Sequence, residues 1–480
     1  MRHATAPNKN NIYFYYATKN KSYVVIMPIK LNDSVFRAYD IRGVYPRDID
    51  AKFAGQVARA YSAFIKGKRL AVSMDVRTSN EKLTKPFIEG LVESGAEVWF
   101  IGIAPTPLLY FTVAHYGLDG GAAVSASHNP PEWNGFKLCG KNSKVLGWGE
   151  GLEKIKEIMQ RDEYVPAAQK GSKVDKSAKV RADYEKFVSD NVNGIKKLRI
   201  GIDPGNGAGS GFAAPILSRM NMDVIAINDE PDGRFPSRNP EPKPETLTDL
   251  KSLVLEKRLD FGAAFDGDAD RVIFVDDKGE VLYGDKILAL FANNLIKPGD
   301  KVVYDVSCSD AVTDVVDKKG GVPFITKVGH SAIEAKMLEE NARIGGELSG
   351  HIYFRETYHF DDAFFATAWM AKLVSDSGKS LSKLISELPA YKSTVKEFEV
   401  DDGKKFGVID KVRHSLSSKG VKTINVDGVK AITEDGWFII RASNTTPKIK
   451  VVAEAKSEKR VLQLFSIAKS ELDVAIASAK

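Results

Sequence analysis

The chain has 480 residues, of which 43% are hydrophobic and 28% charged, an ordinary composition for a globular protein. Its length predicts three or four domains, at about 100–200 residues per domain. The net charge of +6 balances 69 basic against 63 acidic residues, an excess too small for a nucleic-acid or membrane-surface protein. Its two cysteines exclude a disulfide framework, and no run reaches the roughly 18 apolar residues of a membrane span. We therefore expect a cytoplasmic protein with neither a nucleic-acid nor a membrane partner.

The first 30 residues differ from the rest of the chain. The segment "NIYFYYATKNKSYVVIMPIK" is aromatic, then basic, then briefly apolar. Lysines interrupt it and no clear small-residue cleavage site follows, which argues against a secretory signal peptide. We predict that residues 1–30 form a disordered or misassigned extension, with Met27 as an alternative start.

Three later segments repeat one pattern; they begin at Arg69, Leu198 and Lys301. In each, an apolar run ends near an aspartate and is followed by a polar turn, an amphipathic helix and a second apolar run. This order is typical of a βαβ unit with buried parallel strands. Any α/β chain can repeat it, but the domain-sized spacing and the shared aspartate favour three related α/β domains. The aspartates are Asp75, Asp203 and Asp305.

The pattern changes from about Lys396. Residues alternate between polar and apolar around polar turns, as in hairpins, and "SEKRVLQLFSIAKSELDVAIASAK" has apolar residues at helical spacing. This predicts a smaller α+β domain with a mostly antiparallel sheet and a final helix. We place the four domains at residues 31–175, 176–279, 280–392 and 393–480.

The stretch "GAAVSASHNPPEWNGFK" places Ser127 in a polar loop after an apolar run. A serine in such a loop is usually structural. Here His128 could orient it or exchange a proton, Pro130 and Pro131 stiffen the loop, and Lys137 offers a cation. A G-x-S-x-G elbow is absent from the sequence, so a hydrolase triad is poorly supported. A phosphate ester on Ser127 beside a metal ion would explain this loop together with the next motif.

That motif is "LDFGAAFDGDADRVIFVDDKG", with Asp266, Asp268 and Asp270 at alternate positions and then Arg271. Three carboxylates this close repel one another unless a cation lies between them, and hard oxygen ligands select Mg²⁺. An EF-hand would need glycine where Arg271 stands, and helical flanks. A solvated acidic turn is the structural alternative, but the strand-like flanks favour a magnesium site.

The stretch "GGELSGHIYF" has Glu347, Ser349 and His351 at alternate positions. Alternation puts side chains on one side of an extended segment. A carboxylate beside a hydroxyl can hold the vicinal hydroxyls of a sugar. The alternative is a glycine-rich turn with incidental polar residues.

The stretch "RASNTTPK" gathers one guanidinium and several hydroxyl and amide groups in eight residues. Such groups bind phosphate, the arginine bidentately and the others through side chain and backbone. A plain turn is the alternative. The candidate residues are Arg441, Ser443, Asn444 and Thr445.

Taken together, in this order, the four loops resemble the α-D-phosphohexomutase superfamily, the phosphomannomutase/phosphoglucomutase enzymes. The resemblance extends from "VFRAYDIRG", which begins at Val35, to "RASNTTPKIKV". It implies three related mixed α/β domains and a C-terminal α+β domain of TATA-binding-protein-like fold, arranged around a central cleft.

The resemblance also implies roles for individual residues. Ser127 would carry the phosphoryl group, and Asp266, Asp268 and Asp270 would bind Mg²⁺ together with the serine phosphate. Glu347 and Ser349 would contact sugar hydroxyls, with His351 nearby. The clamp for the substrate's non-transferring phosphate would be Arg441, Ser443, Asn444 and Thr445. Further active-site positions would be Tyr39, Arg42, His128, Lys137, Arg271 and His330.

The implied reaction interconverts hexose 1-phosphate and hexose 6-phosphate, of mannose and/or glucose, through a bisphosphorylated sugar. A hexose 1,6-bisphosphate would act as activator, and the enzyme would be a monomer or weak homodimer. The motif "GELSGH" is similar to the "GEMSGH" of dual mannose/glucose enzymes, whereas Ser307 replaces a substrate-contacting lysine found in many members. The alternatives are a phosphoglucosamine mutase, a metal-dependent sugar phosphatase and a catalytically dead sugar-phosphate binder.

Overall fold

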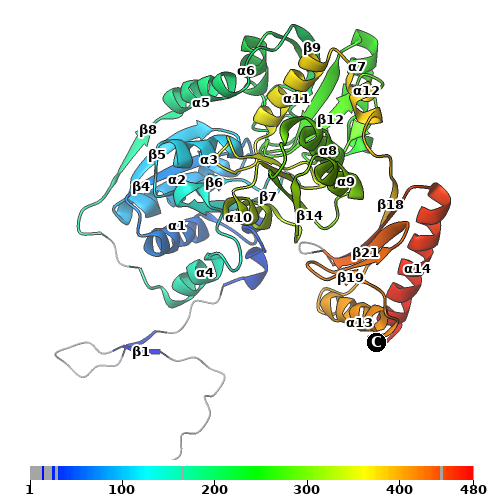
Figure 1. The fold of residues 1–480 in the computed structure, drawn as a ribbon. Helices are drawn as coiled ribbons and strands as arrows, with labels where there is room; N and C mark the ends of the chain where they lie inside the picture. Colours follow the sequence, from blue (N-terminus) through cyan, green and yellow to red (C-terminus); the bar gives the residue numbers. More distant parts are fainter. Residues whose placement is uncertain (1–12, 16–23, 27–30, 165–166, 444–446, 479–480) are drawn as a thin grey trace, which may run out of the picture.

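A computed structural model describes residues 13–15, 24–26, 31–164, 167–443 and 447–478 (Figure 1). In the predicted N-terminal extension, β1 (Tyr13–Tyr15) pairs antiparallel with β2 (Val24–Ile26). The rest of that extension, Met27 included, lies outside the described residues. In the described part of the chain, no helix is long and apolar enough to cross a membrane.

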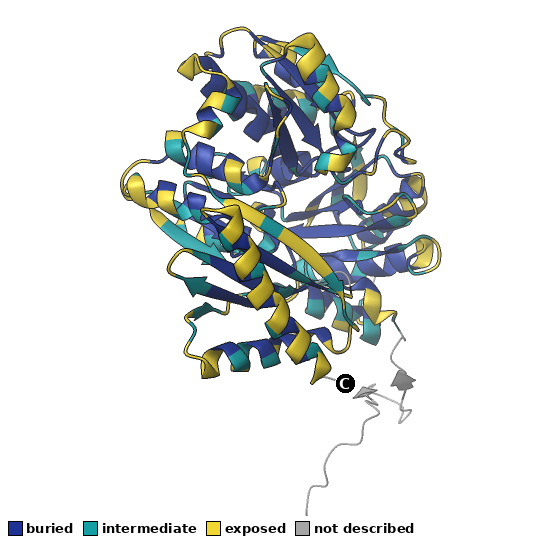
Figure 2. Cartoon of the chain, turned by 90° about the vertical axis from the view of Figure 1, so that its right-hand side faces the viewer, coloured by how far each residue is buried: buried dark blue, intermediate teal, exposed yellow. Residues whose placement is uncertain are grey.

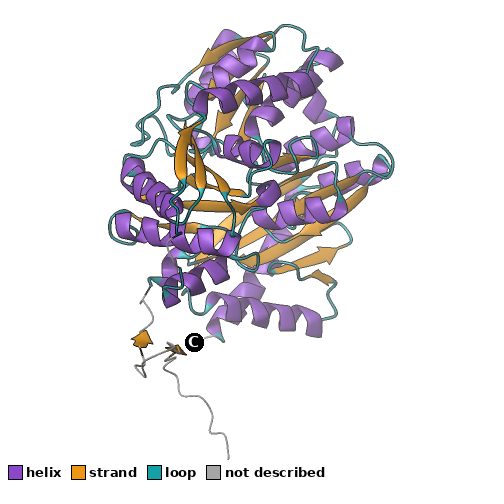
Figure 3. Ribbon diagram, turned by 90° about the vertical axis from the view of Figure 1, so that its left-hand side faces the viewer, coloured by secondary structure: helices purple, strands orange, loops and turns teal. Residues whose placement is uncertain are grey.

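The first domain is a six-stranded mixed sheet with helices on both faces (Figure 3). Successive residues of a strand face opposite sides, so Leu70 and Val72 pack under one helical layer and Ala71 under the other. One layer is α1 (Ala51–Ile65), α2 (Asn80–Glu93) and α4 (Leu152–Arg161), and the other is α3 (Thr106–His115) and α5 (Ser177–Asn191). The strands, in spatial order, are β3 (Ile41–Val44), β7 (Trp133–Gly140), β6 (Gly120–Val124), β4 (Arg69–Met74), β5 (Glu97–Ile103) and β8 (Ser172–Asp175).

The second domain has a five-stranded sheet covered by α6 (Ala213–Arg219) on one face and α7 (Thr248–Lys257) on the other. Its strands, in spatial order, are β10 (Met222–Ala226), β9 (Leu198–Asp203), β11 (Phe261–Phe265), β12 (Val272–Asp276) and β13 (Val281–Leu282). Because β13 pairs with β12, this sheet extends past the boundary predicted at residue 279.

The third domain has a four-stranded sheet, with α8 (Gly284–Leu295) and α9 (Asp310–Lys318) on one face and α10 (His330–Glu340) on the other. Two more helices follow, α11 (Ala363–Ser377) and α12 (Leu381–Ser386). One hydrophobic core runs through all three domains, because residues of α3, α6 and α8, one helix from each domain, belong to it together. The strands, in spatial order, are β15 (Val322–Thr326), β14 (Lys301–Asp305), β16 (Ile344–Gly346) and β17 (Ile352–Phe354).

The three predicted repeats are confirmed as βαβ units. In each, the strand that ends near the aspartate pairs in parallel with the strand after the helix: β4 with β5, β9 with β10, and β14 with β15. The aspartate therefore lies at the carboxyl end of a parallel strand in every domain, which is where ligand sites of α/β sheets form.

The C-terminal domain is a five-stranded sheet in which every pairing is antiparallel, as predicted. Its helices α13 (Lys405–Ser418) and α14 (Glu458–Ala477) cover one face, and α14 presents a largely exposed outer side (Figure 2). On the other face, Trp437, Ile439 and Val452 pack against Val306 of the third domain. The strands, in spatial order, are β18 (Lys392–Glu399), β22 (Lys448–Ala455), β21 (Gly436–Ala442), β20 (Val429–Thr433) and β19 (Thr423–Ile424).

Candidate active site

Ser127 lies in the loop between β6 and β7 and is 1% exposed. Its φ of +49° is in the left-handed region, which a residue with a side chain rarely adopts. The backbone N–H donates to Ser125 Oγ at 2.9 Å. Such a backbone persists only where the surroundings hold it, and residues of this kind cluster at active sites.

Arg77 stabilises this loop through hydrogen bonds to its backbone. Its buried guanidinium donates to the carbonyl oxygens of Ser127 at 2.8 Å, Asn129 at 2.6 Å and Trp133 at 2.9 Å. It also pairs with Asp75, with Nε and Oδ2 3.1 Å apart. The sequence pattern did not single out Arg77; its only signal was a position two residues after a strand-end aspartate.

The three aspartates of the second domain meet the serine loop. Asp266, Asp268 and Asp270 are buried, and one oxygen of each lies within 4.8 Å of the others. Ser127 Oγ donates to Asp266 Oδ2 at 2.8 Å, across the domain boundary. Burial, together with the charges of its two neighbours, raises the pKa of Asp266 well above its usual value.

The donor set suits a hard divalent cation. Asp268 Oδ1 and Asp270 Oδ1 are buried and have no hydrogen-bond partner among the described residues. Buried carboxylate oxygens without partners cost free energy unless a cation compensates them. Oxygen-only ligands are the ones Mg²⁺ prefers, so the residues fit this ion.

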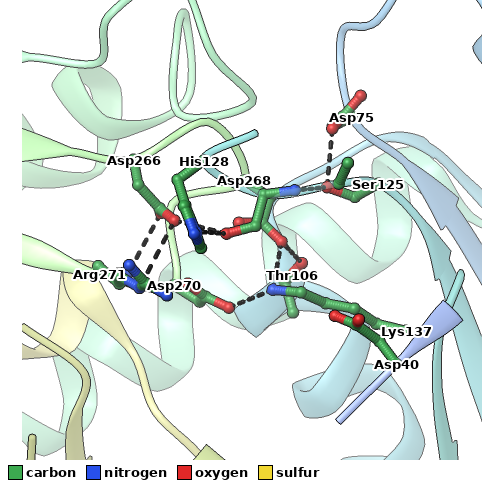
Figure 4. A network of polar contacts seen from close by, with 12 residues as sticks. Asp40, Asp75, Thr106, Ser125, His128, Lys137, Asp266, Asp268, Asp270 and Arg271 are labelled. Atoms are coloured by element: carbon green, nitrogen blue, oxygen red, sulfur yellow. Dashed lines mark hydrogen bonds and ion pairs between the residues drawn. The ribbon is translucent and has the colours of Figure 1, made fainter. Parts of the chain in front are cut away.

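Lys137, on β7, lies against the same carboxylates (Figure 4). Its Nζ is 2.6 Å from Asp268 Oδ2 and also pairs with Asp270. Burial disfavours the charged ammonium, but the two carboxylates outweigh burial and raise the pKa of Lys137 above its ordinary value. The same ion pair, against the effect of burial, keeps the pKa of Asp270 below its ordinary range. The lysine therefore stays charged and neutralises part of the cluster.

Two further groups border Ser127. His128 Nδ1 is 3.1 Å from Ser127 Oγ, and burial, with nearby cationic groups, lowers the pKa of His128 well below its usual value. Arg42, on β3, pairs with Asp40 at 2.7 Å and donates to Asn129 Oδ1 at 2.6 Å. The serine loop thus has a neutral imidazole beside it and a second arginine bound to its backbone and side chains.

The sugar-motif residues gather around one carboxylate in the turn between β16 and β17. Glu347 Oε2 accepts from Ser349 Oγ at 3.1 Å and lies 3.8 Å from His351 Nε2. Glu347 Oε1 accepts from the N–H of Gly329. Burial raises the pKa of Glu347 and lowers that of His351 to about 4, so the imidazole is neutral at pH 7.

A direct contact joins the metal loop to the sugar loop. Arg271 directly precedes β12 and donates from Nε to His351 Nε2 at 2.8 Å. The two residues also form an isolated antiparallel bridge through their backbones. The second and third domains therefore meet at this pair.

Tyr39 of the first domain contacts the third domain near His330. The Tyr39 hydroxyl donates to the carbonyl of Val328 at 2.5 Å, and its ring lies 5.4 Å from the His330 ring, centroid to centroid. Gly329 has a φ of +133°, and a Cβ there would come within 2.2 Å of the Tyr39 ring. Only glycine fits at this close approach.

The predicted phosphate clamp reaches the same loop. Arg441, on β21, lies 3.3 Å from Asp427 Oδ2, which accepts from the N–H of Val328 at 3.2 Å. The backbone N–H of Ser443 donates to the Lys448 carbonyl at 2.8 Å. Asn444 and Thr445 lie outside the described residues. The fourth domain thus contacts the third at the edge of the site.

Known proteins agree with this architecture. The models of the phosphoglucomutase/phosphomannomutase family match along the chain, with α/β/α domains I, II and III at residues 33–165, 180–279 and 283–391 and the C-terminal domain at 390–467. The chain belongs to the phosphoglucomutase/phosphomannomutase family.

Individual relatives cover nearly the whole chain. The chain is 34% identical over 455 residues to a phosphomannomutase/phosphoglucomutase of Pseudomonas putida, covering 93% of this chain and 97% of that protein. It is 36% identical over 435 residues to a probable phosphoglucosamine mutase of Methanopyrus kandleri, covering 89% and 95%. A crystal structure of a family protein from Burkholderia thailandensis superposes with a TM-score of 0.86 at 30% identity, covering 93% and 98%.

Proposed function

We propose that the protein is a phosphohexomutase that interconverts the 1-phosphate and 6-phosphate of mannose and/or glucose. The observation that carries the proposal is the contact of Ser127 Oγ with Asp266 at 2.8 Å inside a buried cluster of three carboxylates. This contact sets a hydroxyl nucleophile, on a strained loop, directly against a cation site. Phosphoryl transfer depends on such positioning and charge neutralisation more than on covalent chemistry by the protein.

The proposed cycle has two transfers. The bond between phosphorus and Ser127 Oγ breaks as the free hydroxyl of the sugar phosphate forms a bond to the same phosphorus. The proton of that hydroxyl passes to a base, for which neutral His128 is the candidate. The bisphosphorylated sugar then reorients and returns its other phosphoryl group to Ser127. A hexose 1,6-bisphosphate acts as activator because it restores the phosphoserine.

Asp266, Asp268 and Asp270 would hold Mg²⁺ together with the phosphate on Ser127. The ion, when bound, neutralises charge on the transferring group. Lys137, with its pKa raised, adds a permanent positive charge from the first domain. Arg271, near Asp266, and Arg42, bound to Asn129 of the serine loop, supply further positive charge.

The sugar and its second phosphate are assigned to the third and fourth domains. Glu347 and Ser349 would accept equivalent hydroxyls in both orientations of the sugar, and the substrate's non-transferring phosphate would bind at the clamp. We assign the remaining substrate contacts to Tyr39, His330, His351, Arg441, Ser443, Asn444 and Thr445. We further propose a cytoplasmic monomer or weak homodimer, in keeping with the two separate free thiols of Cys139 and Cys308.

The test is a coupled assay of the purified chain with Mg²⁺ and a trace of glucose 1,6-bisphosphate. Mannose 1-phosphate, glucose 1-phosphate and glucosamine 1-phosphate are offered in parallel, and free phosphate is followed. The proposal expects the 6-phosphate of mannose or glucose without free phosphate. Free phosphate without isomerisation would mean a phosphatase, preference for the amino sugar a phosphoglucosamine mutase, and no reaction a sugar-phosphate binder.

Ser127→Ala is the decisive variant. We expect turnover to fall by at least about a thousandfold, because the nucleophile is lost, while the melting temperature stays near that of the wild type. Ser143→Ala is the matched control, since Ser143, at the end of the short 3-10 helix Lys141–Ser143, is also a buried serine with a positive φ but donates to a backbone carbonyl. Near-normal turnover of Ser127→Ala would rule out the covalent route.

A further inference from the structure

Asp361 is a buried carboxylate to which the proposed reaction gives no part. It lies between β17 and α11, where an isolated bridge sets it opposite Tyr353. The next residue, Asp362, has a plain structural role, because its side chain accepts from the N–H groups of Phe364 and Phe365 and caps α11. Asp361 makes no such cap. Its Oδ2 instead contacts Nδ1 of His351.

The position of the proton on His351 follows from counting donors. Arg271 Nε carries a hydrogen and can only donate, so His351 Nε2, 2.8 Å away, must accept. An imidazole that accepts at Nε2 carries its proton on Nδ1, and that N–H faces the Asp361 carboxylate. Asp361 therefore stabilises the one tautomer of His351 that can bind Arg271.

The orientation of Arg271 depends on this bond. Its Nε lies 3.9 Å from Asp266 Oδ2, and its backbone N–H donates to Asp266 Oδ1 at 3.3 Å, next to Ser127. A long arginine side chain has many rotamers, and a fixed acceptor at Nε selects among them. The acceptor comes from the third domain and the arginine from the second. Without Asp361, the imidazole could turn its N–H toward Nε and repel the guanidinium.

We propose that Asp361 is a positioning residue of the mutase reaction: it holds His351 in the Nδ1–H tautomer and thereby fixes Arg271 beside the metal loop. The proposal rests on the proposed function for its kinetic consequence, whereas the tautomer of His351 can be observed in the absence of turnover.

The same residues allow another interpretation, which the geometry disfavours. One ligand atom each of Asp270, His351 and Asp361 lie within 4.8 Å of one another, as in a metal site. Both ring nitrogens of His351 are however already engaged, one by Arg271 and the other by Asp361. Lys137 also pairs with Asp270, so the ammonium group of a neighbouring side chain already neutralises part of the charge of these carboxylates.

The test is a double-mutant cycle on the full-length chain with Asp361→Asn, His351→Ala and the pair. Asp361→Asn should lower kcat about tenfold to a hundredfold, with KM changed less than about threefold, the usual cost of losing the group that orients a functional histidine. On the His351→Ala background the same change should have no further effect, because Asp361 acts through His351. Losses that multiply in the double variant would overturn the proposal.

Histidine ¹⁵N NMR supplies the second readout. The chain has 7 histidines, and the signal absent from His351→Ala identifies His351. The wild type should show the Nδ1–H tautomer, and Asp361→Asn a mixture or the reverse tautomer. An unchanged tautomer would contradict the proposal, as would a second bound metal ion per chain that Asp361→Asn removes. If Asp361→Asn does not fold, Asp361→Glu, which retains the carboxylate, takes its place and should shift the His351 signals.

Asp276→Asn is the matched control. Asp276 is a buried carboxylate at the far end of β12, where Oδ1 accepts from the N–H groups of Lys278 and Glu280. The same substitution there should leave kcat and the tautomer of His351 unchanged. If the wild type itself had no mutase activity, the proposed function would fail, while the NMR comparison would still decide the role of Asp361.

Discussion

The strand-end aspartates of the first two domains differ from that of the third. Asp75 and Asp203 each pair with a buried arginine, Arg77 at 3.1 Å and Arg238 at 2.7 Å. Asp305 has no ion pair among the described residues; its Oδ2 accepts from the N–H of Leu348 in the sugar loop at 2.9 Å. Yet all three carboxylates accept from the backbone N–H two residues further on. The three repeats thus share the same turn at the aspartate Oδ1, but the other carboxylate oxygen, Oδ2, has different partners.

The arginines brace the loops that would do the chemistry. Arg77 binds carbonyls of the serine loop, and Arg238 binds the carbonyls of Asp203 and Phe265, directly before the metal aspartates. Phosphoryl transfer is sensitive to displacements of an ångström, which a buried guanidinium with several acceptors resists. In the proposed reaction, the loop around Glu347 would accept a sugar in two orientations, which is a different task. Its strand-end aspartate, Asp305, contacts it through one backbone N–H, that of Leu348, and, within the described part of the chain, brings no buried arginine to it.

Removing the buried arginine Arg77 should have the largest effect on stability and turnover. Arg77→Met leaves Asp75 charged, buried and unpaired, so we expect a loss of about 3–5 kcal/mol in the free energy of unfolding. Misplacement of the serine loop should also lower turnover by more than about a hundredfold. Denaturant unfolding and the coupled assay measure both. Arg47→Met, which removes an exposed ion pair with Asp48, is the control and should change the free energy of unfolding far less, because water already screens this pair. Equal effects of Arg77→Met and Arg47→Met would refute the proposal that Arg77 stabilises the serine loop.

Asp305→Asn should have a smaller and different effect. One of its two oxygens becomes an amide donor, so the side chain can no longer accept from both Ser307 and Leu348, and one bond is lost, at about 1.5–3 kcal/mol for a bond to a charged group. The loss falls on the sugar loop, and we expect KM to rise about tenfold with kcat changed less than about twofold. Asp175→Asn is the control, because Asp175 accepts from the second residue onward at 2.9 Å but holds no functional loop. A large fall in kcat instead would assign Asp305 to the chemical step.

Substitution of Glu454 should have the smallest effect, and this effect should be on the pH dependence of stability rather than on turnover. It belongs to β22 and accepts from the N–H of Asp310, at the start of α9, at 2.9 Å and from Trp437 Nε1 at 3.0 Å. Burial raises its pKa to about 7 from an ordinary 4.5. The folded protein therefore binds this proton more tightly than the unfolded chain, and the stabilisation, full below pH 4.5, is lost as pH rises through about 7.

Glu454→Gln keeps the acceptor oxygen and removes the titration. The melting temperature of the wild type should fall between pH 5 and pH 8 by more than that of this variant. Glu458→Gln, on the exposed start of α14, is the control and should behave like the wild type. Parallel pH profiles for all three proteins would show that the contact between the third and fourth domains does not titrate.

Much of the site could be predicted because its motifs are local. Ser127, the three metal-loop aspartates and the Glu347 loop each occur within a few residues, and alternation along an extended chain orients them. The braces, the Asp361–His351–Arg271 series and the Asp427 contact of Arg441 could not be predicted. Each of them joins segments far apart in the sequence, and a single arginine or aspartate carries no local pattern that distinguishes it from a solvated charge.

The amino-acid sequence by itself determined the repeated βαβ units, the antiparallel fourth domain and the residue types of the four loops, because hydrophobic periodicity and spacing act over short distances. Only the tertiary structure decided which carboxylates gain a cationic partner. That choice depends on burial, since a charge removed from water must find a partner, and partners are supplied by whichever distant segment packs beside it. The difference between Asp75 and Asp305, which begin identical turns, is the result.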